Sequence, residues 1–240
     1  MAEIGCFIFA RGGSRGLKNK NLLDFAGKPL IAWTIEQALE NSRVKRVIVS
    51  TDSPEIAEIS QFYGAEIPFI RPPELASDTS PELDSWKHAL EFLNETEGSI
   101  PEIFLSLPCT APLRIQDDID RNLDCLTENN ADIAISVSPS MRSPYFNMIQ
   151  LSESGQANLV IESDTKYSRR QDVPQTFDIT TVAYSARSRF ILDTNNIMSG
   201  KVFASLVDRN RAIDIDDALD FDVAEFLFKK KSGKNDPKSL

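Results

Sequence analysis

The sequence contains little histidine, little cysteine and no long apolar run. His88 is the only histidine, so a Ser-His-Asp triad would have to use it, and its neighbours are typical of a helix. The three cysteines, Cys6, Cys109 and Cys125, fit neither a zinc site nor a disulfide framework, and we expect Cys109 to be a small buried thiol. No apolar stretch approaches the ~20 residues that span a bilayer, and the first residues lack the pattern of a signal peptide. We therefore expect a cytoplasmic protein with no membrane partner.

Positive charge is also scarce. The chain has 26 lysines and arginines against 36 aspartates and glutamates, which gives a net charge of −10. This acidity argues against nucleic acid as a partner, because nucleic-acid binding needs a basic field. Between Arg11 and Lys28, however, five cations accompany one acid, Asp24. A cationic cluster in an acidic chain indicates an anionic ligand at that place.

Short apolar runs alternate with amphipathic stretches along most of the chain. We predict strands at residues 4–10, 44–49, 65–70, 103–107, 131–137, 179–185 and 202–206. We predict helices at residues 30–39, 53–63, 80–95, 117–129 and 216–228. This alternation predicts an α/β fold with a mostly parallel, Rossmann-like sheet that is flanked by helices.

Residues 139–178 break this alternation. The segment is polar and contains Pro144, Gly155 and Pro174, with few periodic apolar positions. We predict a small antiparallel excursion here, with short strands near 145–151 and 157–161. The chain then divides into a core at residues 1–138 and 179–230, a subdomain at residues 139–178 and a flexible, lysine-rich tail at residues 231–240.

A glycine-rich, basic loop follows the first predicted strand. Its glycines and cations are Gly12, Gly13, Gly16, Arg11, Arg15, Lys18 and Lys20. The glycines would let backbone N–H groups approach a ligand closely, and the cations would offset the charge of a triphosphate. The spacing matches neither a Walker A loop nor a dinucleotide fingerprint. Because ligands lie beyond the carboxyl ends of the strands in open α/β sheets, we interpret the segment as a phosphate loop; a flexible basic turn is the alternative.

Several ordered motifs point to one family. The stretch Ala10-Arg11-Gly12-Gly13-Ser14-Arg15-Gly16, with Lys20-Asn21 and Gly27-Lys28-Pro29-Leu30 after it, resembles the signature of the acylneuraminate cytidylyltransferases, which make CMP-sialic acids. The resemblance continues through residues 49–52, 71–79, 112–114 and 214–216, and so covers nearly the whole chain.

This resemblance implies a Mg²⁺-dependent nucleotidyltransferase. It would transfer CMP from CTP to the anomeric hydroxyl of a nine-carbon sugar acid, sialic acid or a legionaminic- or pseudaminic-type relative, and release pyrophosphate. An acceptor of another kind, an eight-carbon sugar acid or molybdopterin, is an alternative within the same fold. A module that binds nucleotide without turnover is an alternative of a different class.

The resemblance also implies which residues hold the nucleotide. They are Ala10, Arg11, Gly12, Gly13, Ser14, Arg15, Lys20, Asn21, Arg71 and Ser80. Arg11 and Lys20 would act in catalysis together with Asp216, while Arg71 and the backbone around Ser80 would read the cytosine. Without the resemblance, Arg71 would be interpreted as a surface arginine before a Pro-Pro turn.

Two carboxylates near the C-terminus suggest a metal. Asp214 and Asp216 stand at i and i+2, on one face if the segment is extended. Hard carboxylate oxygens suit Mg²⁺, which commonly bridges to substrate phosphates. The alternative is that Asp216 and Asp217 only favour the start of the following helix.

The acceptor half of the sequence departs from the family pattern. Pro108 stands where many members have glutamine, and the family's Asn-Gly-Ala-Ile-Tyr becomes Thr180-Thr181-Val182-Ala183-Tyr184. The sugar contacts that the resemblance implies are Thr110, Arg170, Thr180 and Tyr184. It further implies a homodimer built through residues 139–178, with a monomeric hairpin flap as the alternative.

Overall fold

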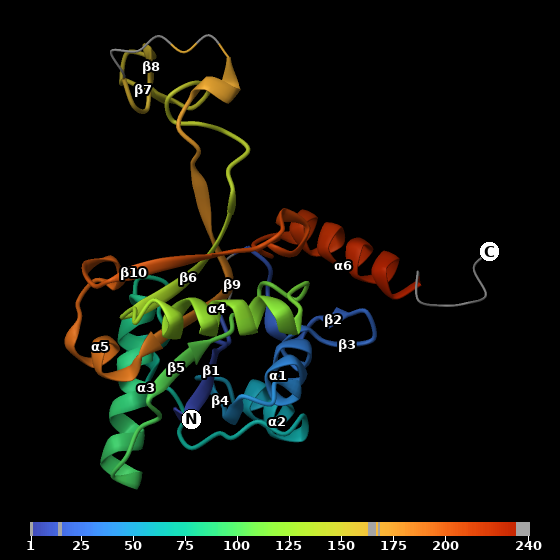
Figure 1. Cartoon of the computed structure of the whole chain (residues 1–240). Coiled ribbons are helices and arrows are strands. Elements are labelled where there is room, and N and C mark those ends of the chain that lie inside the picture. The colour runs from blue at the N-terminus through green and yellow to red at the C-terminus, as the bar shows by residue number, and fades with distance from the viewer. Residues whose placement is uncertain (1, 14–15, 163–166, 168, 234–240) are drawn as a thin grey trace.

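The computed structural model describes residues 2–13, 16–162, 167 and 169–233. A six-stranded sheet runs through this part of the chain in the order β10-β6-β9-β5-β1-β4 (Figure 1). Its strands are β1 (Ile4–Phe9), β4 (Val44–Ser50), β5 (Ile103–Ser106), β6 (Ile133–Pro139), β9 (Phe177–Arg187) and β10 (Val202–Leu206). β9 pairs antiparallel with β5 and β6, and the other pairs are parallel. The predicted α/β fold with a mostly parallel sheet is thus confirmed.

Helices cover both faces of this sheet. They are α1 (Leu30–Glu40), α2 (Pro54–Phe62), α3 (Glu82–Glu97), α4 (Gln116–Glu128), α5 (Ser188–Asp193) and α6 (Ala218–Gly233). Apolar side chains of α1, α2 and α4 pack in one core with alternate residues of β1, while α3 and α5 pack in a second core with Phe7. Because both faces of β1 are buried, its sequence is apolar throughout and does not alternate.

Short elements complete the described chain. The two-residue strands β2 (Asp24–Phe25) and β3 (Lys28–Pro29) pair after the glycine-rich loop. The 3-10 helices are η1 (Lys20–Leu22), η2 (Pro73–Ala76), η3 (Arg170–Asp172), η4 (Ile197–Ser199) and η5 (Arg209–Arg211). Among the described residues, no helix is long and apolar enough to cross a membrane.

One predicted strand is wrong and one helix was not predicted. Residues 65–70 make a single parallel bridge, between Glu66 and Ile48, and form no strand. Pro68 accounts for this, because proline has no N–H to continue the ladder. The unpredicted helix α5 has only six residues, too few for a helical period to be visible in the sequence.

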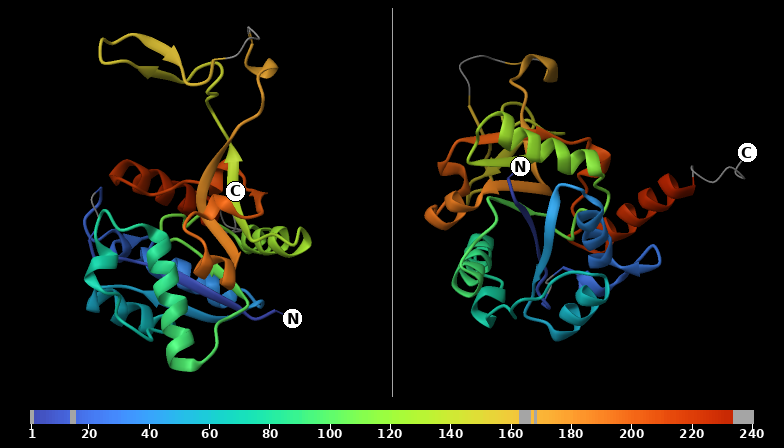
Figure 2. Two further views of the ribbon diagram at one scale, coloured as in Figure 1. Left: turned by 90° about the vertical axis from the view of Figure 1, so that its left-hand side faces the viewer. Right: turned by 60° about the horizontal axis from the view of Figure 1, so that its bottom comes forward.

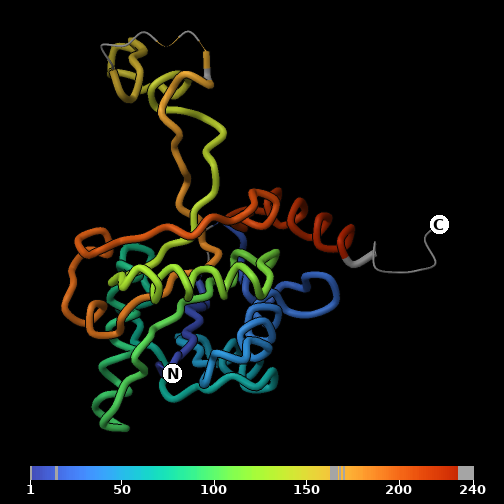
Figure 3. The backbone as a smooth tube through the Cα atoms, in the orientation of Figure 1, coloured from blue at the N-terminus to red at the C-terminus, as the bar shows by residue number. Residues whose placement is uncertain are grey.

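The segment between β6 and β9 leaves the core as an arm. Figure 2 shows it standing away from the sheet, and Figure 3 shows its two backbone legs side by side at the base. At its end, β7 (Ile149–Leu151) and β8 (Ala157–Leu159) form a two-stranded antiparallel ladder. Most of the predicted tail, residues 231–240, lies outside the described residues, and α6 continues through its first three positions.

Candidate active site

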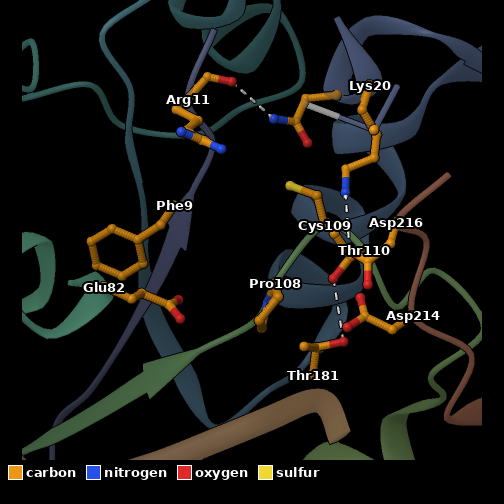
Figure 4. Close-up of a pocket in the computed structure, with 12 residues that line it drawn as sticks. Phe9, Arg11, Lys20, Glu82, Pro108, Cys109, Thr110, Thr181, Asp214 and Asp216 are labelled. Carbon is orange, nitrogen blue, oxygen red and sulfur yellow. Dashed lines mark hydrogen bonds and ion pairs between the residues drawn. The ribbon is translucent and has the colours of Figure 1, made fainter. Parts of the chain in front are cut away.

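A cavity of about 340 Å³ opens beyond the carboxyl ends of β1 and β5 (Figure 4). This is where ligands bind in open α/β sheets, because the loops that leave neighbouring parallel strands meet there. Its lining comes from five separate parts of the chain. The lining residues are Phe9, Arg11, Gly16, Lys20, Asn21, Glu82, Pro108, Cys109, Thr110, Thr181, Asp214 and Asp216.

The glycine-rich loop is held by its own backbone and by Asp52. Gly12 N donates to Asp52 Oδ1 at 2.8 Å, and Asn21 Nδ2 donates to the carbonyl of Arg11 at 3.3 Å. A Cβ added at Gly16 would lie 2.1 Å from the carbonyl oxygen of Asp216, so only glycine allows this approach. Two positions of the predicted nucleotide site, Ser14 and Arg15, lie outside the described residues.

Lys20 joins this loop to the acidic segment near the C-terminus. Its ammonium donates to the carbonyl of Ile215 and lies 3.9 Å from Asp216 Oδ1. The Lys20 side chain is only 12 % exposed, whereas that of Asp216 is 78 % exposed. A buried cation therefore lies beside an accessible carboxylate, as Figure 4 shows.

Asp214 and Asp216 are fixed by the residue between them. Ile215 is fully buried, and its N–H donates to the carbonyl of Thr110 at 2.9 Å. Asp214 Oδ1 is buried and has no hydrogen-bond partner among the described residues. Partial desolvation by the cavity walls and the negative charge of Asp214 raise the pKa of Asp216, and Lys20 opposes this shift. The described residues contain no cluster of three or more metal-ligating side chains, so the two aspartates would need further ligands from water or substrate.

The start of α6 separates the two interpretations of this acidic segment. Asp217 Oδ1 accepts from the backbone N–H of Asp220 at 3.0 Å, and Asp220 Oδ2 accepts from the N–H groups of Asp216 and Asp217. These reciprocal bonds form a capping box. Asp217 is therefore the side chain that caps the helix, and the Asp216 carboxylate faces Lys20.

Two arginines lie beside the loop on its other flank. Arg11 Nη1 is 2.5 Å from Asp78 Oδ1, which links the loop to the segment before α3. Arg71 is buried: its Nε donates to Ser50 Oγ at 3.0 Å, and its guanidinium lies 5.6 Å from the centre of the Phe9 ring. Burial lowers the pKa of Arg71 to about 10, although Asp52 and Glu82 oppose the shift. The interpretation of Arg71 as a surface arginine is therefore wrong.

Ser80, the other residue predicted to lie near the cytosine, is half-buried and does not line the cavity.

The predicted sugar contacts are placed in different ways. Thr110 lines the cavity and donates to Thr181 Oγ1 at 3.2 Å. Thr180 is buried and donates to the carbonyl of Ser136 at 3.3 Å. Successive residues of a strand point to opposite faces, so its neighbour Thr181 is the residue that reaches the cavity. The role predicted for Thr180 would therefore need a rearrangement of β9.

A further predicted contact, Tyr184, lies outside the cavity lining. Tyr184 packs against Trp86 with ring centres 5.8 Å apart, and burial, followed by the charges of Glu82 and Asp214, raises its pKa to about 12. Arg170 begins η3 in the arm, and the prediction for its side chain falls outside what the structure describes.

Sequence reasoning missed Glu82 and Thr181 as cavity residues. An acid in the first turn of a helix is common, so Glu82 carries no sequence signal of a site. Cys109 does line the cavity, but burial raises its pKa to about 12, which fits an unreactive thiol. His88 lies outside the cavity lining and packs edge-on against Phe69, with ring centres 4.9 Å apart.

Comparison with known proteins agrees with this geometry. The chain is 35% identical to the CMP-N,N'-diacetyllegionaminic acid synthase of Campylobacter jejuni over 97% of each chain. It is 30% identical to the pseudaminic acid cytidylyltransferase of the same species, over 93% of this chain and 95% of the relative. In fold it is similar to a CMP:2-keto-3-deoxy-manno-octonic acid synthetase solved with CTP, with a TM-score of 0.70 and 18% identity over 96% of this chain and all of that one.

The family described as cytidylyltransferase has a sequence model that matches residues 6–233. The match includes the glycine-rich loop, Lys20 and both aspartates of the cavity. On this evidence the chain belongs to the cytidylyltransferase family.

Proposed function

We propose that this protein transfers CMP from CTP to the anomeric hydroxyl of a nine-carbon sugar acid and releases pyrophosphate. The observation that carries the proposal is the contact between Lys20 and the Asp214–Asp216 segment in one cavity. A cationic loop for a triphosphate and carboxylates for a divalent metal thus meet at the carboxyl end of a parallel sheet. The two bacterial relatives, named for legionaminic and pseudaminic acid, support a nine-carbon acceptor.

The reaction joins the anomeric oxygen to the α-phosphorus while the bond from that phosphorus to pyrophosphate breaks. The anomeric oxygen loses its proton, and negative charge grows on the departing pyrophosphate. Such a transfer depends on positioning and on offsetting charge in line with the leaving group. Arg11, Lys20 and the N–H groups of the glycine-rich loop supply positive charge on that side of the cavity.

The two aspartates fit a magnesium ion. Asp214 Oδ1 is a buried carboxylate oxygen with no partner in the part of the chain that the structure describes, and the Asp216 carboxylate is accessible beside it. Asp214 and Asp216 would hold Mg²⁺, which when bound offsets charge on the phosphates and on pyrophosphate. Lys20 holds the backbone between them, so the two carboxylates keep their orientation.

Pyrophosphate release tests the proposal directly. Each of the four nucleoside triphosphates is combined with Mg²⁺ and a panel of eight- and nine-carbon sugar acids. We expect pyrophosphate release with CTP and a nine-carbon sugar acid. We expect no release when a chelator has removed the Mg²⁺. The absence of release with CTP for every acceptor would overturn the proposal.

Substitution of neighbouring aspartates separates catalysis from helix capping. Asp216→Asn should lower kcat by about 100-fold or more, since a metal ligand is lost while folding is kept. Asp217→Ala should instead reduce the free energy of unfolding by about 1 kcal/mol, because the cap of α6 is lost, and keep turnover. Equal losses of stability and turnover in Asp216→Asn would contradict a metal role.

We also infer a homodimer that is built through the arm. A two-stranded ladder alone is marginally stable in water, and the ladder of this arm exposes Ile149 to 57% and Leu151 to 67%. A second copy would cover these side chains. Leu151→Asp should halve the mass measured by light scattering, whereas Glu153→Gln nearby should not.

The free cysteines fit a reducing cytoplasm as the location of the protein.

A further inference from the structure

Glu82 places a carboxyl group in the cavity that has no part in the steps above. The residue starts α3, and Glu82 Oε1 accepts a hydrogen bond from Trp86 Nε1 at 3.2 Å. Figure 4 shows its carboxylate pointing into the cavity toward Pro108, across from the two aspartates. A carboxylate has about four acceptor positions, so one bond from Trp86 leaves capacity for a ligand.

The surroundings make this carboxyl group selective. Glu82 is exposed at the cavity wall. Partial desolvation there raises the pKa of Glu82, the bond from Trp86 and the charge of Arg71 lower it, and the charge of Asp214 raises it. A carboxylate at this wall favours a ligand group that donates a hydrogen bond and repels a second negative charge. The carboxylate of a bound sugar acid must therefore point away from Glu82.

The facing wall complements Glu82. Pro108 has no side-chain donor or acceptor. Beside it, Thr110 donates to Thr181 Oγ1 at 3.2 Å, so the Thr181 hydroxyl keeps its own proton for another acceptor. Both Pro108 and Thr181 line the cavity. On one wall of the cavity, Glu82 thus offers a hydrogen-bond acceptor, and on the facing wall Thr181 offers a hydrogen-bond donor.

We propose that Glu82 and Thr181 select the acceptor: Glu82 accepts a hydrogen bond from an N–H or O–H substituent of the sugar acid, and Thr181 donates one to an oxygen of the same substrate. This inference rests on the proposed function and narrows its substrate class. The preferred acceptor carries an acylamino or hydroxyl group at the position that faces Glu82, and its own carboxylate lies on the other side.

The test varies the acceptor at saturating CTP. Glu82→Gln keeps an oxygen for Trp86 but replaces the carboxylate; Glu91→Gln, exposed on the same helix, is the matched control. We expect Glu82→Gln to raise the KM for an acylamino nonulosonate about tenfold or more and to leave the KM for CTP within twofold. Thr181→Val should also raise the acceptor KM, and Thr181→Ser should restore it.

Acceptor analogues provide a second measurement, and its first part uses only the wild-type protein. An analogue in which one acylamino or hydroxyl group is replaced by hydrogen should lose about tenfold or more in kcat/KM with the wild-type protein. With Glu82→Gln, the same analogue should show little loss of kcat/KM, because the carboxylate that binds the missing group is already absent. Such non-additivity would support direct contact.

Three results would overturn the inference. The first is an unchanged acceptor KM in Glu82→Gln and Thr181→Val. The second is a raised KM for CTP, or a lower preference for CTP over UTP, in Glu82→Gln, which would assign Glu82 to the nucleotide. The third is equal use of all analogues by the wild-type protein. Failure of the proposed function differs from all three, because the wild-type protein would then release no pyrophosphate from CTP with any acceptor.

Discussion

Gly16 is the point at which the glycine-rich loop touches the segment that carries Asp216. A Cβ at this position would lie 2.1 Å from the Asp216 carbonyl oxygen, closer than the 3.0 Å below which real Cβ contacts essentially do not occur. In Gly16→Ala, the loop and the Asp216 segment must therefore separate by roughly 1 Å. The carbonyl is backbone, so no flexible side chain can absorb the displacement.

The expected consequence is a loss of turnover with little loss of stability. A misplacement of about 1 Å near reacting groups costs on the order of 100-fold in rate, and we expect kcat of Gly16→Ala to fall by about that factor. Gly16 is exposed and its φ is not positive, so alanine should change the free energy of unfolding by less than about 1 kcal/mol.

The assay measures kcat at saturating CTP and acceptor, together with urea unfolding. Gly13→Ala is the comparison within the same loop, since an added Cβ there meets no atom of the described residues within 4 Å, and it should lower kcat less than Gly16→Ala does. If Gly16→Ala kept kcat within threefold of the wild type, the close approach of loop and acidic segment would not be part of the active protein.

Three further predictions concern ionisable groups. Arg211 Nε and Nη2 lie 2.8 and 2.9 Å from the buried carboxylate of Asp118, so Arg211→Met should cost about 3 kcal/mol in urea unfolding. The more exposed Arg43→Met should cost less than about 1 kcal/mol, and similar losses would contradict this difference. With a pKa of about 12, Cys109 is almost wholly protonated at pH 8, so native activity should survive iodoacetamide; inactivation that follows labelling of Cys109 would refute this. Partial desolvation raises the pKa of Glu82, so its ionisation costs stability as pH rises above the ordinary carboxyl range; the gain in Tm from Glu82→Gln should be larger at pH 8 than at pH 4, and an equal gain would argue against a raised pKa.

The parts of the fold that could be predicted from sequence are those buried on both faces. β1 lies within a predicted apolar run, because a strand covered on both sides needs apolar residues on both faces. The prediction failed at residues 65–70, where an apolar run lies beside β4 but Pro68 prevents continued pairing. Composition alone does not show which backbone groups find partners.

The candidate site divides in a similar way. The glycine-rich loop and the Asp214–Asp216 pair are local patterns, so the sequence could identify them. Thr181 could not be distinguished from Thr180, because the choice depends on which face of β9 turns toward the cavity. Glu82 was missed because its importance comes from the side chains around it, which belong to other parts of the chain.

The contact between Lys20 and Ile215 joins residues 195 positions apart in the chain. Contacts between such distant positions form late, since the entropy of closing the intervening loop must be overcome first. During synthesis, the glycine-rich loop therefore exists for most of the time without Asp214 and Asp216. Under the proposed function, a partly made chain that ends before Asp214 would have the loop proposed for the triphosphate but not the carboxylates proposed for Mg²⁺, so turnover would begin only when the C-terminal segment has been made and has docked.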